Sequence, residues 1–332
     1  MSSEVPPKAR IESLYVLKAL CSFLVVVVHT QFCAKGALTP LLGIATPCFL
    51  TITGFLLYSA DAQREQYKAL KWARKTFLLS LACNVLYLAF YLWDGAPLSR
   101  YGVEVLGLNL LTGHKISMHL WYLTAVWQGL LLLWLLRRYA PWLIRLAPLL
   151  YIIAYILRAY GKQLFPGVDA DTLFIMRANA IVTALPFLAT GYLVHQYQER
   201  ILMHINVIAC TIGMVLLAYA EYALRQWLGG SSIYFLTTWP MVVMLMLLCC
   251  RYKPFTLPVV GYIGRAHSAN IYYFHILVLI YANRLVPEYA AWQAVLVFAG
   301  TLPISCLFNT IINGYRKAAN RIKACQEARA GV

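Results

Sequence analysis

Three polar side chains interrupt the first long apolar segment of the chain: Lys18, Ser22 and His29. An α-helix turns by about 100° per residue, so the eleven steps from Lys18 to His29 place all three side chains on one face. The rise of about 1.5 Å per residue separates Lys18 from His29 by roughly 16 Å, which excludes a direct ion pair. Imidazole titrates near neutral pH, so His29 is suited to proton transfer. The alternative is that Lys18 extends to the membrane interface and His29 is a satisfied core histidine.

Two further histidines lie in apolar segments, and each has aromatic neighbours. His119 begins the run His119-Leu120-Trp121-Tyr122, and His275 ends the run Ile271-Tyr272-Tyr273-Phe274-His275. Ionisable groups are costly in hydrocarbon, so each is a candidate functional residue. With the topology given below, all three histidines fall in the outer half of the bilayer. Trp121 and Tyr122 have a second interpretation, as residues of the interfacial aromatic belt.

A basic stretch follows the second apolar segment. Lys68, Lys71 and Lys75 fall at helical spacings of three and four, as do Lys71 and Arg74. One interpretation is a topology determinant that contacts anionic lipid. The other is a cradle for a phosphorylated cytoplasmic ligand, since Arg and Lys side chains suit phosphate.

The composition is that of a membrane protein. The 332 residues are 61% hydrophobic, 14% aromatic and 12% charged, which excludes a soluble enzyme, a disordered chain, a coiled coil and a disulfide scaffold. The nine cysteines show no metal-ligand spacing and are interpreted as small buried hydrophobic residues, so we expect no metal site. We expect an all-α, polytopic protein with a single transmembrane domain over residues 1–332.

About ten spanning helices are expected, because hydrocarbon requires every backbone group to bond internally and a spanning helix needs about 20 residues. The core helices cover residues 14–313, and residues 314–332 form a cytoplasmic tail. The fifth span is the weakest, since it has Arg at 145 and 158. The ten spans are predicted at 14–33, 40–60, 76–93, 119–136, 142–158, 178–197, 203–224, 232–250, 264–284 and 290–313.

The distribution of Lys and Arg predicts the orientation. If the N-terminus is cytoplasmic, nineteen of the twenty-eight basic residues lie inside and eight lie outside, with Lys18 within the first span. This ratio agrees with the positive-inside rule and places both termini in the cytoplasm. Because topology accounts for the net charge of +16, we expect no nucleic-acid partner. The first segment lacks a cleavage pattern and is expected to remain as a helix.

Six short motifs follow one another along the chain. They are the Lys18–x10–His29 pair, Thr53-Gly54-Phe55-Leu56-Leu57, Lys71-Trp72-Ala73-Arg74, His119-Leu120-Trp121-Tyr122-Leu123, Pro186-Phe187-Leu188-Ala189-Thr190-Gly191-Tyr192-Leu193 and Ile271-Tyr272-Tyr273-Phe274-His275. Together they resemble the motifs of integral-membrane acyltransferase family 3, with Lys18 where the family more often has Arg. One position departs from the family pattern, because Tyr15 stands where the family often has Asp.

The resemblance implies transfer of an acyl group, most often acetyl, from cytoplasmic acyl-CoA to a hydroxyl of a cell-surface or lipid-linked carbohydrate. His29 would act as general base on that hydroxyl, with a covalent acyl-histidine as the alternative. Lys18, His119 and Tyr122 would stabilise the charge that develops on the thioester oxygen. His275 and Trp121 are expected to bind substrate.

The resemblance also implies the partners. Lys68, Lys71, Arg74 and Lys75 would bind the phosphates of acyl-CoA, which acts as a co-substrate, and no tightly bound cofactor is expected. Membrane lipid and a carbohydrate acceptor are the other expected partners, and a homo-oligomer is possible. The expected location is a bacterial inner membrane. Two rival functions remain, a secondary transporter and a non-catalytic membrane partner protein. Counterflow without CoA would favour the first, and failure to bind acyl-CoA the second.

Overall fold

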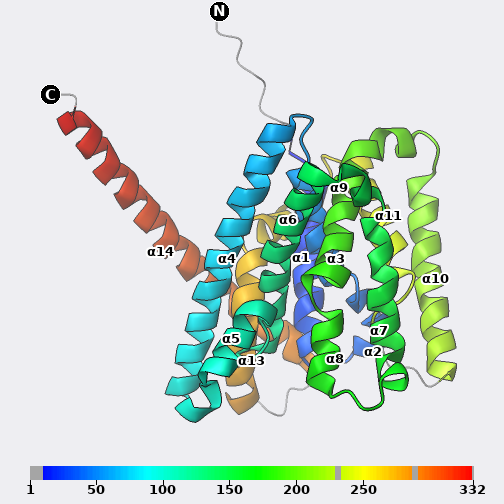
Figure 1. Ribbon diagram of the computed structural model, residues 1–332, viewed down its shortest axis with the longest axis horizontal. Coiled ribbons are helices and arrows are strands. Elements are labelled where there is room, and N and C mark those ends of the chain that lie inside the picture. The colour runs from blue at the N-terminus through cyan, green and yellow to red at the C-terminus, as the bar shows by residue number, and fades with distance from the viewer. Residues whose placement is uncertain (1–9, 229–232, 286–290, 331–332) are drawn as a thin grey trace, which may run out of the picture.

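The computed structural model describes residues 10–228, 233–285 and 291–330, and these parts of the chain form helices and no strands. Most of the helices run side by side as a bundle (Figure 1). Their bounds are α1 Glu12–His29, α2 Lys35–Leu42, α3 Ala45–Leu57, α4 Ala62–Trp93, α5 Val103–Thr112, α6 Trp121–Tyr139, α7 Leu150–Leu164, α8 Ala170–Arg177, α9 Leu185–Leu202, α10 Val207–Trp227, α11 Thr238–Arg251, α12 Pro258–Ala266, α13 Ser268–Leu285 and α14 Gln293–Ala330.

Six of the helical segments in the described residues are long and apolar enough to cross a membrane. A seventh is obtained if α8 and the helical run Ala180–Leu202, which meet at a bend of 42°, form one span. The chain is therefore a multi-pass membrane protein, while the count of ten spans and the orientation of the termini stay predictions. The six segments are Glu12–His29, Lys35–Leu57, Ala62–Trp93, Met118–Tyr139, Val207–Trp227 and Gln293–Arg321.

Several predicted boundaries differ from the observed ones. Helix α4 begins at Ala62, so the basic stretch lies on its first turns and not in a loop before residue 76. Asp61 makes this early start favourable, because its carboxylate accepts hydrogen bonds from the backbone N–H groups of Gln63 and Arg64. The predicted tail also continues α14 as a helix to Ala330. Lys8, one of the nineteen basic residues predicted to be cytoplasmic, lies outside the described residues, as do the first residues of the spans predicted at 232–250 and 290–313.

The weak fifth span is irregular in the structure. Residues 141–149 form two short 3-10 turns, Pro141–Arg145 and Ala147–Leu149, and only then does α7 begin. Helix α7 has 15 residues, fewer than the roughly 20 that a straight span requires. The two arginines that flank this segment therefore lie on a short, interrupted element.

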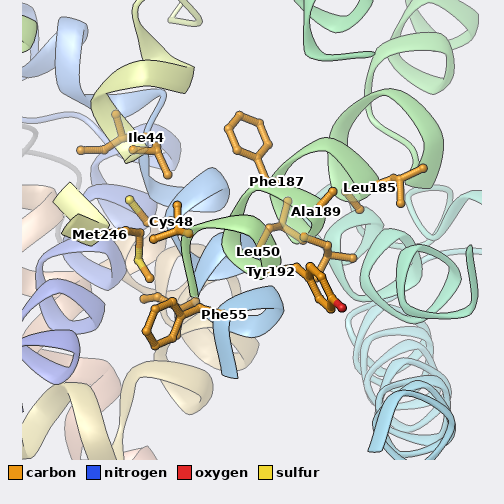
Figure 2. Close-up of a cluster of buried hydrophobic side chains, with 14 of the residues drawn as sticks. Ile44, Cys48, Leu50, Phe55, Leu185, Phe187, Ala189, Tyr192 and Met246 are labelled. Atoms are coloured by element: carbon orange, nitrogen blue, oxygen red, sulfur yellow. The ribbon is translucent and has the colours of Figure 1, made fainter. Parts of the chain in front are cut away.

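Helices α3 and α9 pack backbone against backbone at the centre of the bundle. A Cβ atom on Gly54 would lie 1.9 Å from the carbonyl oxygen of Leu188, and one on Gly191 would lie 1.9 Å from that of Thr51. Only glycine lets the two helix backbones approach this closely, and small residues are common at such contacts between membrane helices. Figure 2 shows part of the buried cluster around this contact, with Phe55 from α3 and Phe187 from α9.

The expectation of buried cysteines holds for only part of the set. Cys21, Cys48, Cys83, Cys249 and Cys250 are buried, whereas Cys33 and Cys306 are exposed and Cys210 is half-buried. The side chain of Cys325 lies outside the described residues. The prediction was wrong for Cys33, which lies in the turn between α1 and α2, and for Cys306, which lies on an exposed face of α14. A position in an apolar segment does not determine which face of a helix packs inward.

Candidate functional site

Three histidines from distant parts of the chain come together, two of them buried and His29 exposed. His29 is the last residue of α1, His119 belongs to the 3-10 turn Met118–Leu120 that precedes α6, and His275 lies within α13. The ring centroid of His275 is 5.2 Å from that of His29 and 5.2 Å from that of His119. The structure thus brings together the three candidates that the sequence placed at one depth.

His275 is oriented by its own helix. It is fully buried, and its Nδ1 lies 3.0 Å from the carbonyl oxygen of Ile271 and 2.9 Å from that of Tyr272. A carbonyl oxygen only accepts hydrogen bonds, so Nδ1 carries the proton and Nε2 of the neutral ring presents its lone pair. Within the described residues, His275 Nε2 has no hydrogen-bond partner.

One ring nitrogen of His119 has a hydrogen-bond partner, and the other has none in the described residues. Its Nδ1 lies 3.0 Å from Ser117 Oγ, and its Nε2 is buried without a hydrogen-bond partner in the described part of the chain. The O–H of Tyr272 donates to the backbone carbonyl oxygen of His119, which ties α13 to the start of α6. The ring of Tyr87, from α4, lies 4.8 Å from the His119 ring. Helices α4, α6 and α13 therefore position this imidazole together.

A cavity of about 530 Å³ opens next to the histidines. His29, His119 and Trp121 all line it, whereas the fully buried His275 does not. His29 is exposed, and this cavity gives a substrate access to its ring. Because α1 ends here, the cavity lies toward the predicted outer side of the membrane, and we call it the outer cavity.

A second cavity, of about 340 Å³, lies between α1, α3, α4, α6 and α13. Lys18, Lys75 and Tyr122 line it, together with Trp72 and Tyr272. It shares no lining residue with the outer cavity. The structure therefore divides the four residues predicted to be catalytic, with His29 and His119 at the outer cavity and Lys18 and Tyr122 at this one, which we call the inner cavity.

The aromatic pair Tyr122 and Tyr272 connects the two regions. Their ring centroids are 5.1 Å apart, and the Tyr272 ring lies 5.6 Å from that of His119. Tyr272 thus lines the inner cavity and also bonds to the residue that lines the outer one. Ser22, the third polar residue of the first motif, is buried and donates to the carbonyl oxygen of Lys18, so its hydroxyl is already satisfied.

The predicted phosphate-binding residues lie on the first turns of α4. Lys71, Arg74 and Lys75 are exposed and Lys68 is half-buried. Lys71 Nζ lies 5.7 Å from the centroid of the Tyr67 ring. Of the four, only Lys75 lines the inner cavity, and the others extend along the same helix toward its beginning.

Sequence reasoning missed three basic residues of the outer cavity: Arg158, Lys162 and Arg177. They were counted among the eight cations outside the membrane, as exceptions to the positive-inside rule, and Arg158 was also one of the two arginines that weaken the fifth predicted span. Their predicted position on the outer side, against the positive-inside rule, was the signal in the sequence that could have identified them. No group of three His, Cys, Asp or Glu in the described residues is arranged to hold a metal ion.

The comparison with protein families agrees with the motifs. A family model described as an acyltransferase domain, that of acyltransferase family 3, matches residues 11–310, nearly the whole chain. No curated protein and no solved structure matches the chain. The matched region contains every helix from α1 to α13, both cavities and all three histidines. The chain therefore belongs to acyltransferase family 3, and it is a multi-pass membrane acyltransferase.

Proposed function

We propose that this acyltransferase moves an acyl group, most simply acetyl, from acyl-CoA to a hydroxyl of a carbohydrate, with His29 as general base. The observation that supports this most directly is the position of His29 beside His119 and His275, in a cavity large enough for a sugar. The bacterial inner membrane, with the carbohydrate at the cell surface or linked to lipid, is part of the proposal.

The inner cavity suits the donor. Its lining is largely apolar, and Lys18 and Lys75 supply positive charge in the same lining as Trp72. The acyl-pantetheine arm of CoA would occupy this cavity, and Lys71 and Arg74 on the exposed part of α4 would contact the nucleotide phosphates. Lys68 completes this basic set. Because Lys18 faces the inner cavity, its charge would act on the donor and not on His29.

The chemistry follows from these positions. An imidazole nitrogen of His29 takes the proton of the acceptor hydroxyl as its oxygen attacks the thioester carbonyl carbon. The C–O bond forms and the C–S bond breaks, and the departing thiolate of CoA takes the proton back from His29. Tyr122 and His119, whose ring centroids lie 5.1 Å and 5.6 Å from that of Tyr272, would stabilise the oxyanion. An acyl group carried on His29 remains the alternative route.

The direct test is incubation of the purified protein in nanodiscs with labelled acetyl-CoA and a panel of surface glycans, followed by mass spectrometry of the glycans. The proposal expects an acetylated glycan and one free CoA thiol for each acetyl group transferred. A protein that neither binds nor cleaves acyl-CoA would contradict the proposal. Exchange of labelled substrate in proteoliposomes that survives His29→Ala would instead favour a transporter.

A further inference from the structure

The outer cavity carries concentrated positive charge. Arg158 and Lys162 come from α7 and Arg177 ends α8, and all three line the cavity that contains His29. None of the described residues that line this cavity is Asp or Glu. The other titratable side chains among the described lining residues are His29, His119 and Tyr234. Arg158, Lys162 and Arg177 are therefore the permanently charged side chains among the described residues that line this cavity.

Two of these cations are held close together. Arg158 Nη2 donates to the backbone carbonyl oxygen of Arg177 at 3.0 Å and to Thr183 Oγ1 at 3.2 Å. The Arg158 guanidinium carbon lies 3.8 Å from the centroid of the Tyr234 ring. Its Nε is buried and has no hydrogen-bond partner in the described residues. A buried, charged donor without a partner is costly unless an acceptor binds there.

Nearby carboxylates are already engaged elsewhere. Asp171, on the same helix as Arg177, binds His114 Nε2 at 2.8 Å and also Lys115. Glu221 is bonded to Arg225 and to the backbone of Leu236 and Thr237. Among the described residues, Arg158, Lys162 and Arg177 form no ion pair. The missing negative charge must then come from a ligand or from solvent ions.

We infer that the acceptor in the outer cavity is an anionic sugar, one that carries a carboxylate or a phosphate. This rests on the proposed function, because it names the class of acceptor for the same site. Guanidinium groups bind both anions through paired N–H donors. Trp121, in the same cavity, offers an aromatic surface for the sugar ring, and His29 faces the same space.

Binding of the CoA phosphates does not explain the basic residues of the outer cavity. The inner cavity has its own cations, Lys18 and Lys75, and shares no lining residue with the outer cavity. Since α7 and α8 meet the outer cavity from the end of the bundle at which α1 finishes, the CoA phosphates would be far from Arg158 and Arg177. Two separate basic sites therefore indicate two anionic substrates.

The test uses binding, so it needs no acyl donor. Saturation-transfer NMR would compare methyl glucuronide, methyl glucoside 6-phosphate and neutral methyl glucoside on the full-length protein in nanodiscs of zwitterionic lipid. At least one anionic sugar should bind about tenfold more tightly than the neutral one, the scale of a charged hydrogen bond. The glucuronide and the phosphate arms identify which anion is preferred. Equal affinities, or no binding of any of the three sugars, would overturn the inference.

Variants make the test specific to the cavity. Arg158 also bonds to Arg177 and Thr183, so its loss could unfold this region, and Arg177→Gln with Lys162→Gln is the better variant. The double variant should reduce the preference for the anionic over the neutral sugar to about twofold or less. Arg100 is an exposed arginine outside the cavity, and Arg100→Gln should leave this preference unchanged. If the double variant kept the preference for the anionic sugar, the assignment of the binding site to the outer cavity would be contradicted. Loss of the preference in the wild-type protein when phosphatidylglycerol is added to the nanodiscs would also contradict it.

The two proposals fail in different ways. If labelled acetyl-CoA is never cleaved but the anionic sugar binds preferentially, the acyl-transfer proposal fails and the binding inference stands. If acetyl transfer to neutral sugars proceeds at least as well as to anionic ones, the proposed function stands and the anionic acceptor is wrong.

Discussion

The imidazole rings of His29 and His275 have centroids 5.2 Å apart, although one residue ends α1 and the other lies in α13. His29 is exposed to the outer cavity, whereas His275 is fully buried behind it. The two rings are therefore not equivalent. One can meet a substrate hydroxyl, and the other can only act through its neighbours.

The first prediction concerns His29. His29→Ala should lower acetyl transfer by about 100-fold or more, the usual contribution of a general base. Because the ring faces a cavity, its removal should leave the thermal unfolding midpoint nearly unchanged. Turnover and unfolding are measured on the same preparation. His204→Ala, which removes an exposed histidine, is the matched control. Near-normal turnover of the His29 variant would show that the base lies elsewhere.

The second prediction concerns the donor. Charge reversal of Lys71 and Arg74 to Glu should raise the KM for acetyl-CoA by about tenfold and change kcat little, because these exposed side chains contribute binding alone. The effect should shrink as ionic strength increases. Arg251→Glu, an exposed arginine at the end of α11, is the control. A fall in kcat at unchanged KM would argue against phosphate binding by α4.

The third prediction concerns Tyr272 as a positioning residue. Tyr272→Phe removes the O–H that donates to the carbonyl oxygen of His119 and keeps the ring between the cavities. Losing one buried hydrogen bond costs about 1 kcal/mol, so kcat should fall about fivefold with KM for acetyl-CoA unchanged. Tyr262→Phe, at an exposed position on α12, should behave like the wild type. An unchanged kcat would mean that the bond does not position His119.

The fourth prediction concerns the contact between α3 and α9. Gly191→Ala would place a methyl group 1.9 Å from the carbonyl oxygen of Thr51, so the helices must separate. We expect a loss of about 2 kcal/mol or more in unfolding free energy, as for an overpacked core. Gly213→Ala on α10, where no atom lies within 4 Å, should be neutral or slightly stabilising. Thermal unfolding in detergent compares the two, and equal midpoints would contradict the close contact.

The fifth prediction concerns pH. Two hydrogen bonds from Arg284 lower the pKa of the Asp94 carboxyl below its usual 3.8, so this pair stabilises the folded state above about pH 4. That stabilisation is lost as the pH falls through the lowered pKa. The difference in unfolding midpoint between the wild type and Asp94→Asn should therefore be largest near pH 6 and vanish in acid. A difference that does not depend on pH would exclude the ion pair as its cause.

Much of the fold follows from local sequence. Apolar segments of sufficient length must become helices in hydrocarbon, and each of the ten predicted spans contains a helix in its described part. Boundaries were less accurate, because α4 and α14 extend beyond the apolar part of their sequence. Hydropathy detects the apolar part only, whereas a helix continues as long as its backbone bonds are satisfied.

The sequence by itself determined that Lys18 and His29 share one helix face and lie too far apart to pair, because both facts depend only on helical geometry. It did not determine which groups surround His29. Tertiary packing alone placed His275 against His29, separated the inner cavity from the outer one, and brought Arg158 and Arg177 into the cavity of the proposed base. Contacts between helices far apart in the chain depend on how the helix faces pack, and no local spacing encodes them.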